Sequence, residues 1–285
     1  MSVTIVKEEK RSAPEAARSR LASPRKRASG SLKTTARLLS ILPPVILGLI
    51  LLASWYTGTT SGAVPAYQLP SIASVGDALW NGLSSGIFLS NAWVTLQESV
   101  GGFLIALVVG LPTAYGLARW RPFAATVHPY LAAGQAIPAI VIAPFLVIWL
   151  GYGFVPTLVV CCLVVFFPFV ITSAYGFQSI DRSLMDAARV EGAAFWPLLT
   201  RIEFPLALPA IMAAVRTCLT LSITGALVGE FVAGGDQGLG VLVLLAKNQY
   251  DLAQMFATVG ILACLAAILY GITRGLTWLT EALYG

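Results

Sequence analysis

Six long apolar runs constrain this chain more than any other feature of its sequence. Each run is about 20 residues long, the length that a helix needs to cross the hydrocarbon core of a bilayer. Backbone amides in lipid must find their partners within the segment, so each run is expected to be a helix. The sequence therefore predicts an all-α membrane protein with six transmembrane helices, at residues 38–56, 99–118, 130–150, 154–177, 208–229 and 252–273.

The composition agrees with a membrane protein and offers no reaction centre. Of the 285 residues, 57% are hydrophobic and 11% are charged, which leaves too little polar surface for a soluble domain. The four cysteines fall inside predicted spans, at spacings unlike those of a metal or redox site. His128 has no other ligand type beside it. We therefore expect no metal site and no catalytic residue.

Basic residues set the expected orientation. Ten of the eighteen Lys and Arg residues lie before residue 38, and the positive-inside rule places that end in the cytoplasm. Six spans then place the C-terminus in the cytoplasm as well, and Lys247 is the only basic residue in an outer connection. Residues 1–37 have a net charge of +7 and few bulky apolar side chains, which predicts a disordered tail that lies beside lipid rather than one that binds nucleic acid. Residues 38–285 form the transmembrane domain.

Glycine and proline mark places where the spans should depart from straight, isolated helices. Two GxxxG patterns, at residues 225–229 and 271–275, allow helices to approach closely. Prolines inside the predicted spans are expected to bend them or to break their hydrogen bonding; these are Pro112, Pro138, Pro144, Pro156 and Pro168.

Charge is concentrated in the connection between the fourth and fifth spans. Residues 181–203 hold seven charged side chains, whereas residues 38–180 hold four. Ser183 followed three residues later by Asp186 predicts a capping box and a helix that begins near residue 184. Met185, Ala188 and Gly192 recur at helical spacing on one small face, which is expected to meet a partner protein in water.

The same connection resembles the signature loop of ABC-importer permeases. That loop is written E-A-A, with a glycine four residues after the second alanine and an isoleucine and a proline further on. In this chain the matching residues, with aspartate in place of glutamate, are Asp186, Ala187, Ala188, Gly192, Ile202 and Pro205. The resemblance implies a type I ABC importer transmembrane domain in a bacterial inner membrane, with residues 183–205 as its cytoplasmic coupling loop.

The resemblance also implies partners. Cytoplasmic ABC ATPase subunits would bind ATP and Mg and dock on the coupling helix, through the matched residues together with Arg189 and Glu191. An extracytoplasmic binding protein would deliver the solute, and a second copy of the chain would complete a homodimer. No Gly-Lys dipeptide occurs in the sequence, so the phosphate-binding loop of an ATPase is absent and no cofactor is expected on this chain.

Residues 136–153 and 229–243 resemble one permease branch, which serves nitrate, sulfonates, taurine and bicarbonate, and also riboflavin and hydroxymethylpyrimidine. Ionisable groups within spans are costly in lipid and are expected to face a cavity or a partner helix, and Glu230 is expected to line a flexible, glycine-rich outer loop. The candidates for a translocation path or gate are Phe145, Trp149, Tyr152, Arg216 and Glu230.

The sequence leaves two alternatives open. An ion-coupled secondary transporter is the rival to an ATP-driven importer, although paired repeats with ionisable residues near the midplane are not evident. The second open question is the identity of the solute, because an organic, vitamin-like molecule and a sulfonate or nitrate anion both fit the branch. The scarcity of basic residues on the outer side favours the organic solute.

Overall fold

The structure is a computed structural model that describes residues 29–284, with side chains described from residue 42 to residue 275. Across residues 29–284 the chain is helical apart from turns and connections, and it contains no strand. It divides into two units, residues 1–57 and residues 58–285, which are described separately. Residues 1–28 of the predicted tail lie outside the described residues.

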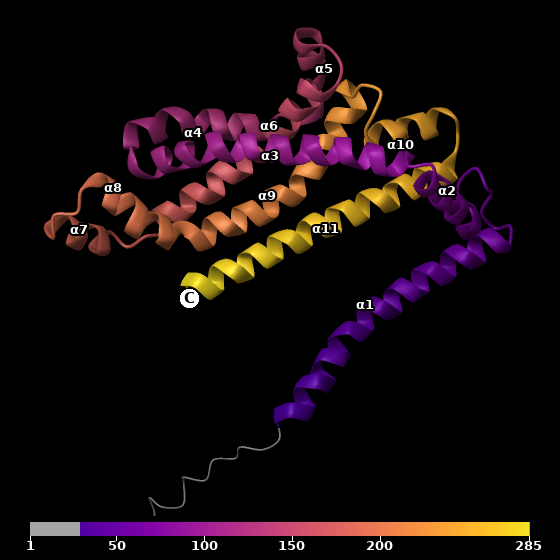
Figure 1. The fold of residues 1–285 in the computed structure, drawn as a ribbon, viewed down its shortest axis with the longest axis horizontal. Coiled ribbons are helices and arrows are strands. Elements are labelled where there is room, and N and C mark those ends of the chain that lie inside the picture. Colours follow the sequence, from indigo (N-terminus) through magenta and orange to yellow (C-terminus); the bar gives the residue numbers. More distant parts are fainter. Residues whose placement is uncertain (1–28, 285) are drawn as a thin grey trace, which may run out of the picture. The chain divides into compact units, whose positions relative to one another are not determined.

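The first unit consists of α1, Ser29–Thr60, whose last residues enter the second unit (Figure 1). This helix begins earlier than predicted, so residues 29–37 belong to it and not to the tail. Those residues include no proline, and nothing in them prevents the helix from extending back from the apolar run. Its segment Leu42–Thr60 is long and apolar enough to span a membrane.

Three helices form the core of the second unit: α3, Ile87–Arg119; α6, Phe154–Gln178; and α9, Phe204–Ala233. The α6 helix packs against both α3 and α9 along much of its length (Figure 1). Buried side chains from all three meet in one cluster, for example Phe103, Phe169 and Cys218. The interior of the unit is therefore built by the second, fourth and fifth predicted spans.

Small residues allow α6 and α9 to approach closely. A Cβ atom added at Gly225 would lie 2.9 Å from Cys161 Cα, and one added at Gly229 would lie 2.9 Å from Thr157 Cα. The GxxxG pattern of residues 225–229 is thus confirmed as a helix contact. The second pattern, at Gly271 and Gly275, faces open space and makes no such contact within this chain.

The third predicted span is broken. Its helices are α4, Arg121–Ala136, and α5, Ala139–Leu150, and their axes differ by 96°. Pro138 has no N–H to donate, and it holds the preceding residue in an extended conformation, with φ −83° and ψ 117° at Ile137. The break at Pro138 agrees with the expectation that this proline would bend the span over residues 130–150 or break its hydrogen bonding, and the bent pair together still has the length of a span.

Helices at the two ends of the core complete the unit. At one end lie α7, Arg182–Val190, and α8, Phe195–Leu198, which continues through a π-helical turn at Leu199–Glu203 into α9. At the other end lie α5 and two shorter helices, α2 (Ile72–Ser84) and α10 (Leu239–Asn248) (Figure 1). These two helices lie in connections between spans and were not predicted from the sequence. The last helix, α11 (Leu252–Tyr284), packs on α9 and α10. Five long helices and the bent pair give six spans in the described chain, as predicted.

We expect Gly225→Val to destabilise the second unit by about 1–3 kcal/mol, because the new side chain would overlap the α6 backbone. Gly271→Val places the same side chain on a spanning helix where it meets nothing within 4 Å, and it should change stability little. Thermal unfolding of the two variants in the same detergent tests the difference. Equal melting temperatures would contradict the close packing of α6 on α9.

Candidate functional site

The α7 helix is capped by Asp181 at its N-terminus. The Asp181 side chain accepts a hydrogen bond of 2.9 Å from the backbone N–H of Ser183, and hydrogen bonding to Ser183 lowers the pKa of the Asp181 carboxyl. The cap is therefore present at neutral pH and is lost when acid protonates the carboxyl. The predicted capping box of Ser183 and Asp186 was wrong, because Asp181 lies two residues nearer the N-terminus and takes the capping position itself.

Gly192 ends α7 in a Schellman motif. The N–H of Ala193 donates to the carbonyl of Ala188 over 3.0 Å, and the N–H of Gly192 donates to that of Arg189 over 3.0 Å. Gly192 has φ +85°, a left-handed conformation that side chains disfavour. A Cβ atom at this position would meet nothing within 4 Å, so within this chain the glycine is required by its backbone conformation rather than by a close neighbour.

The two faces of α7 differ from the expectation. Met185 and Ala188 are buried against Phe177, Leu198 and Ile211 of the chain's own core. They cannot form the small face that was predicted to meet a partner, because the hydrophobic effect turns that face towards α6 and α9. The exposed face instead carries Asp186, Ala187, Arg189, Val190 and Glu191.

Charge on the exposed face is paired only loosely. Arg189 Nη1 lies 3.4 Å from Asp186 Oδ1, and these side chains are 59% and 71% exposed. An exposed pair of this kind contributes about 0.5 kcal/mol or less to stability, so both side chains are free to exchange partners. The α7 helix therefore offers charged, exposed side chains at one end of the core, beyond the ends of α3 and α6 (Figure 1).

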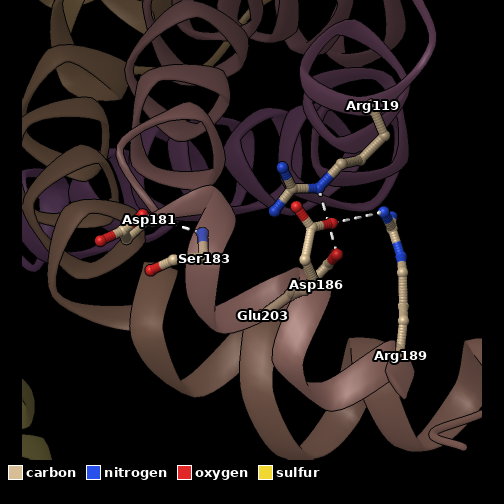
Figure 2. Close-up of polar contacts among 6 residues, drawn as sticks. All are labelled: Arg119, Asp181, Ser183, Asp186, Arg189 and Glu203. Atoms are coloured by element: carbon tan, nitrogen blue, oxygen red, sulfur yellow. Dashed lines mark hydrogen bonds and ion pairs between the residues drawn. The ribbon is translucent and has the colours of Figure 1, made fainter.

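A buried ion pair ties the segment after α8 to α3. Glu203, in the π-helical turn, is 1% exposed, and its Oε1 lies 3.2 Å from Nε of Arg119 in the last turn of α3 (Figure 2). Sequence analysis missed this pair, although Arg119 and Glu203 are both charges next to apolar runs. Nothing in the sequence indicates that residues so far apart meet.

The remaining signature residues occupy the same segment. Ile202 is half-buried and packs on the cluster that contains Met185. Pro205 lies in the first turn of α9 as expected. Because proline lacks an N–H, it cannot complete a regular α-helical turn with Arg201, and the preceding residues form a π-helical turn.

A second polar network lies at the opposite end of the core, around Glu230. Its Oε1 accepts a hydrogen bond of 2.6 Å from Thr95 Oγ1, and its Oε2 accepts one from the backbone N–H of Gly240. Thr95 in turn accepts a hydrogen bond of 2.9 Å from the N–H of Leu239. Glu230 is 2% exposed, so the network satisfies a carboxylate that would otherwise be costly in the membrane.

Hydrogen bonds to side chains of α3 and α9 hold the connection from α9 to α10 in place, so it differs from the flexible loop that was expected. Asn91 of α3 accepts a hydrogen bond of 2.7 Å from the N–H of Gly238, and a Cβ atom at Gly238 would lie 2.6 Å from the Glu230 carboxyl carbon. Glu98 of α3, which was not among the candidate residues, is 2% exposed and is a second buried acid in this half of the core. The role of Glu230 as a gate stays a prediction.

The other candidate path residues lie apart from this network. Phe145 and Trp149 contact each other on α5, with ring centroids 6.4 Å apart, and both they and Tyr152 are exposed. Arg216 of α9 instead contacts the Tyr270 hydroxyl of α11, with its guanidinium carbon 4.7 Å from the ring centroid. Among the described residues no three His, Cys, Asp or Glu side chains converge where a metal ion could bind.

Replacement of Glu203 by Ala should destabilise the solubilised chain by about 2–4 kcal/mol, because Arg119 loses its buried partner. The double variant with Arg119→Ala should lose less than the sum of the two single variants. Asp186→Ala and Arg189→Ala, which break the exposed pair, provide the matched control and should each change stability by about 0.5 kcal/mol or less. Chemical unfolding of all variants provides the comparison, and additive losses at Arg119 and Glu203 would show that the pair is not coupled.

Comparison with known proteins shows the family to which the chain belongs. Residues 102–279 match the family described as binding-protein-dependent transport system inner membrane component. The chain is 40% identical over 227 residues to a riboflavin transport system permease protein of Chloroflexus aurantiacus, covering 80% of this chain and 84% of the relative. It is 29% identical over 227 residues to a formylaminopyrimidine transport permease protein of Halalkalibacterium halodurans, covering 80% and 90%.

The fold agrees with a solved transporter. A methionine ABC transporter in an inward-facing conformation superposes with a TM-score of 0.62, covering 68% of this chain and 96% of that chain. At 20% identity this likeness shows the fold alone. The chain belongs to the binding-protein-dependent ABC transport permeases, the inner membrane components of such systems.

Proposed function

We propose that this permease imports a small organic solute, with the exposed face of α7 as the place where a cytoplasmic ATPase docks. The observation that carries the proposal is the form of α7: a short helix closed at both ends, with one face packed on the chain's own core and with Asp186, Arg189 and Glu191 exposed on the other. Charged rims of this kind steer and orient a helix in a partner's groove.

The proposed assembly contains two copies of this chain. A pair of ATPase subunits would bind ATP and Mg and dock on α7 of each copy, and an extracytoplasmic binding protein would present the solute at the end where α10 lies. This arrangement requires the N- and C-termini to be cytoplasmic, in agreement with the ten basic residues before residue 38.

A riboflavin-like or pyrimidine-like solute fits the chain better than an inorganic anion. The relatives at 40% and 29% identity are named for riboflavin and formylaminopyrimidine. The half of the core that lies away from α7 holds Glu98 and Glu230 as buried acids, and a carboxylate at Glu230, which accepts hydrogen bonds from Thr95 and Gly240, would oppose the passage of an anion. The fastened α9–α10 connection sits over this half of the core.

The α7 helix can pass movement to the spans through rigid contacts. Tyr115 of α3 contacts Phe195 of α8 and Phe177 of α6, with ring centroids 6.3 Å and 5.3 Å apart. The ion pair of Arg119 with Glu203 joins α3 to the π-helical turn between α8 and α9. Closure of an ATPase pair on α7 would therefore bias the arrangement of α3, α6 and α9 together, which is the form of coupling that alternating access requires.

Substitution of Gly192 tests the coupling. Asn tolerates a left-handed conformation better than a β-branched residue does, so we expect uptake to decrease in the order Gly, Asn, Ala, Val, with Gly192→Val losing roughly tenfold or more if the turn loses ~1–2 kcal/mol. Uptake by cells and ATPase retention on the purified complex should be measured together. Unchanged uptake in Gly192→Val with a normal complex would remove α7 from the proposed coupling.

The energy source gives a separate test. In vesicles that contain the permease with its ATPase, uptake should require internal ATP and should persist when ionophores collapse proton and sodium gradients. Substitution of the ATPase phosphate-binding lysine should abolish uptake and leave the permease folded. Uptake that follows an ion gradient and ignores ATP would instead establish secondary transport.

A further inference from the structure

The break between α4 and α5 opens a cavity of about 410 Å³ in the second unit. Its lining comes from residues 134–142 of the broken span and residues 163–168 of α6. The second stretch lies midway along α6, a spanning helix, so the cavity lies near the middle of the membrane. Its volume falls within the roughly 300–1,000 Å³ of sites that hold drug-sized molecules.

Two prolines leave backbone acceptors in the cavity wall. Pro168 lies inside α6 and cannot donate to the carbonyl of Val164, four residues earlier. Pro138 likewise cannot donate to the carbonyl of Gly134, in the last turn of α4. All four residues line the cavity. Non-helical backbone at membrane depth is tolerated only where it is buried in protein or lines a cavity, so these carbonyls mark a place where a polar molecule can be accommodated.

One side chain adds hydrogen-bonding capacity and another adds a flat wall. The exposed Gln135 lies beside Gly134 in the lining, and its amide can both donate and accept. The Phe167 ring packs on the backbone of Gly134, where an added Cβ atom would lie 2.3 Å from the ring. Phe166 also contacts Phe167 edge-to-face, with centroids 5.5 Å apart. These contacts hold the Phe167 ring in place, and a ring in the cavity lining can stack on a flat molecule.

We propose that this cavity is a solute site within the permease, and that it selects flat heteroaromatic molecules with N–H or O–H donors. The proposal rests on the import function proposed above and specifies where and how the solute is recognised. Donors on the rim of such a molecule match the Val164 and Gly134 carbonyls, and its face matches the Phe167 ring. A lipid acyl chain offers no donor and would leave these acceptors unpaired.

Riboflavin is the probe for a direct binding test. The purified full-length chain in nanodiscs, without ATPase or binding protein, should raise the fluorescence anisotropy of riboflavin in a saturable way. Glycine betaine, a small zwitterion with no flat ring, should not displace it. Absence of saturable binding, or equal displacement by glycine betaine, would overturn the proposal.

Adjacent substitutions separate the cavity from the helix that carries it. Ala139→Phe fills the cavity from the first turn of α5, whereas the neighbouring Ile140 is exposed and does not line it. We expect Ala139→Phe to weaken riboflavin binding by roughly tenfold or more, as loss of a shaped pocket does, and Ile140→Phe to bind as the unmodified chain does. Equal affinity in Ala139→Phe would show that the cavity is not the solute site.

Gln135→Leu keeps the size of the side chain and removes the amide, so it tests recognition even if Ala139→Phe does not fold. It should weaken riboflavin binding roughly threefold to tenfold, the loss expected for one neutral hydrogen bond. Ala132→Leu, one turn earlier and outside the lining, is its control. An unchanged affinity in Gln135→Leu would remove the amide from the site and contradict the proposed recognition.

The riboflavin-binding test and the test of ATP-dependent uptake can fail independently of each other. Loss of ATP dependence in vesicles would overturn the import function whether or not riboflavin binds to the cavity. ATP-driven uptake of a non-aromatic solute, with no riboflavin binding, would leave the import function intact and overturn the cavity proposal.

Discussion

A backbone group at membrane depth must find a hydrogen-bond partner inside the protein or line a cavity, and the second unit meets this requirement differently at each place where a helix is interrupted. Between α4 and α5 the break at Ile137 and Pro138 opens a cavity. Before α9 the chain stays helical by widening one turn, from Leu199 to Glu203. After α9 the side chains of Asn91, Thr95 and Glu230 accept the N–H groups of the connection to α10. The features proposed for docking and for solute recognition lie at or beside these interruptions.

The widened turn matters because it carries a buried charge. Glu203 is placed against α3, where it forms an ion pair with Arg119. Removal of either charge would leave the other without its partner in a region of low dielectric. The segment that leads from α7 into α9 is therefore held to α3 by this pair and continues directly into α9.

Much of the fold could be predicted from the sequence, because a long apolar run in lipid satisfies its own backbone hydrogen bonds by forming a helix. The glycine that ends α7 and the proline that begins α9 were also predictable, since each has a local conformational cause. The helix cap was not, because Asp181 and Ser183 are both good capping residues and only the geometry of the chain decides between them. The partner-facing side of α7 was predicted wrongly, because periodicity identifies an apolar face but not what it packs against.

Contacts between residues far apart in the chain could not be predicted either, because a local sequence pattern does not show which distant residues meet. Arg119 and Glu203 carry no signal that pairs them, and nothing in the sequence indicates that Glu98 and Glu230 are buried in the same half of the core. The break at Pro138 was one of five expected bends. Pro112, Pro144 and Pro168 lie inside continuous helices, and Pro156 occupies the first turn of α6, where no N–H is needed.

These contacts determine where the permease can change shape. Glycines bring α6 and α9 to backbone contact, the Glu230 network fixes α3 to the α9–α10 connection, and Arg119 fixes α3 to the segment before α9. A core tied at both ends responds as a rigid body, because packed interiors have few intermediate arrangements. The α4–α5 pair is interrupted by a proline break with a cavity beside it, although α5 also packs on α6 and α9. We therefore expect the opening and closing of a path to include a change at this break, next to the acceptors that are proposed to recognise the solute.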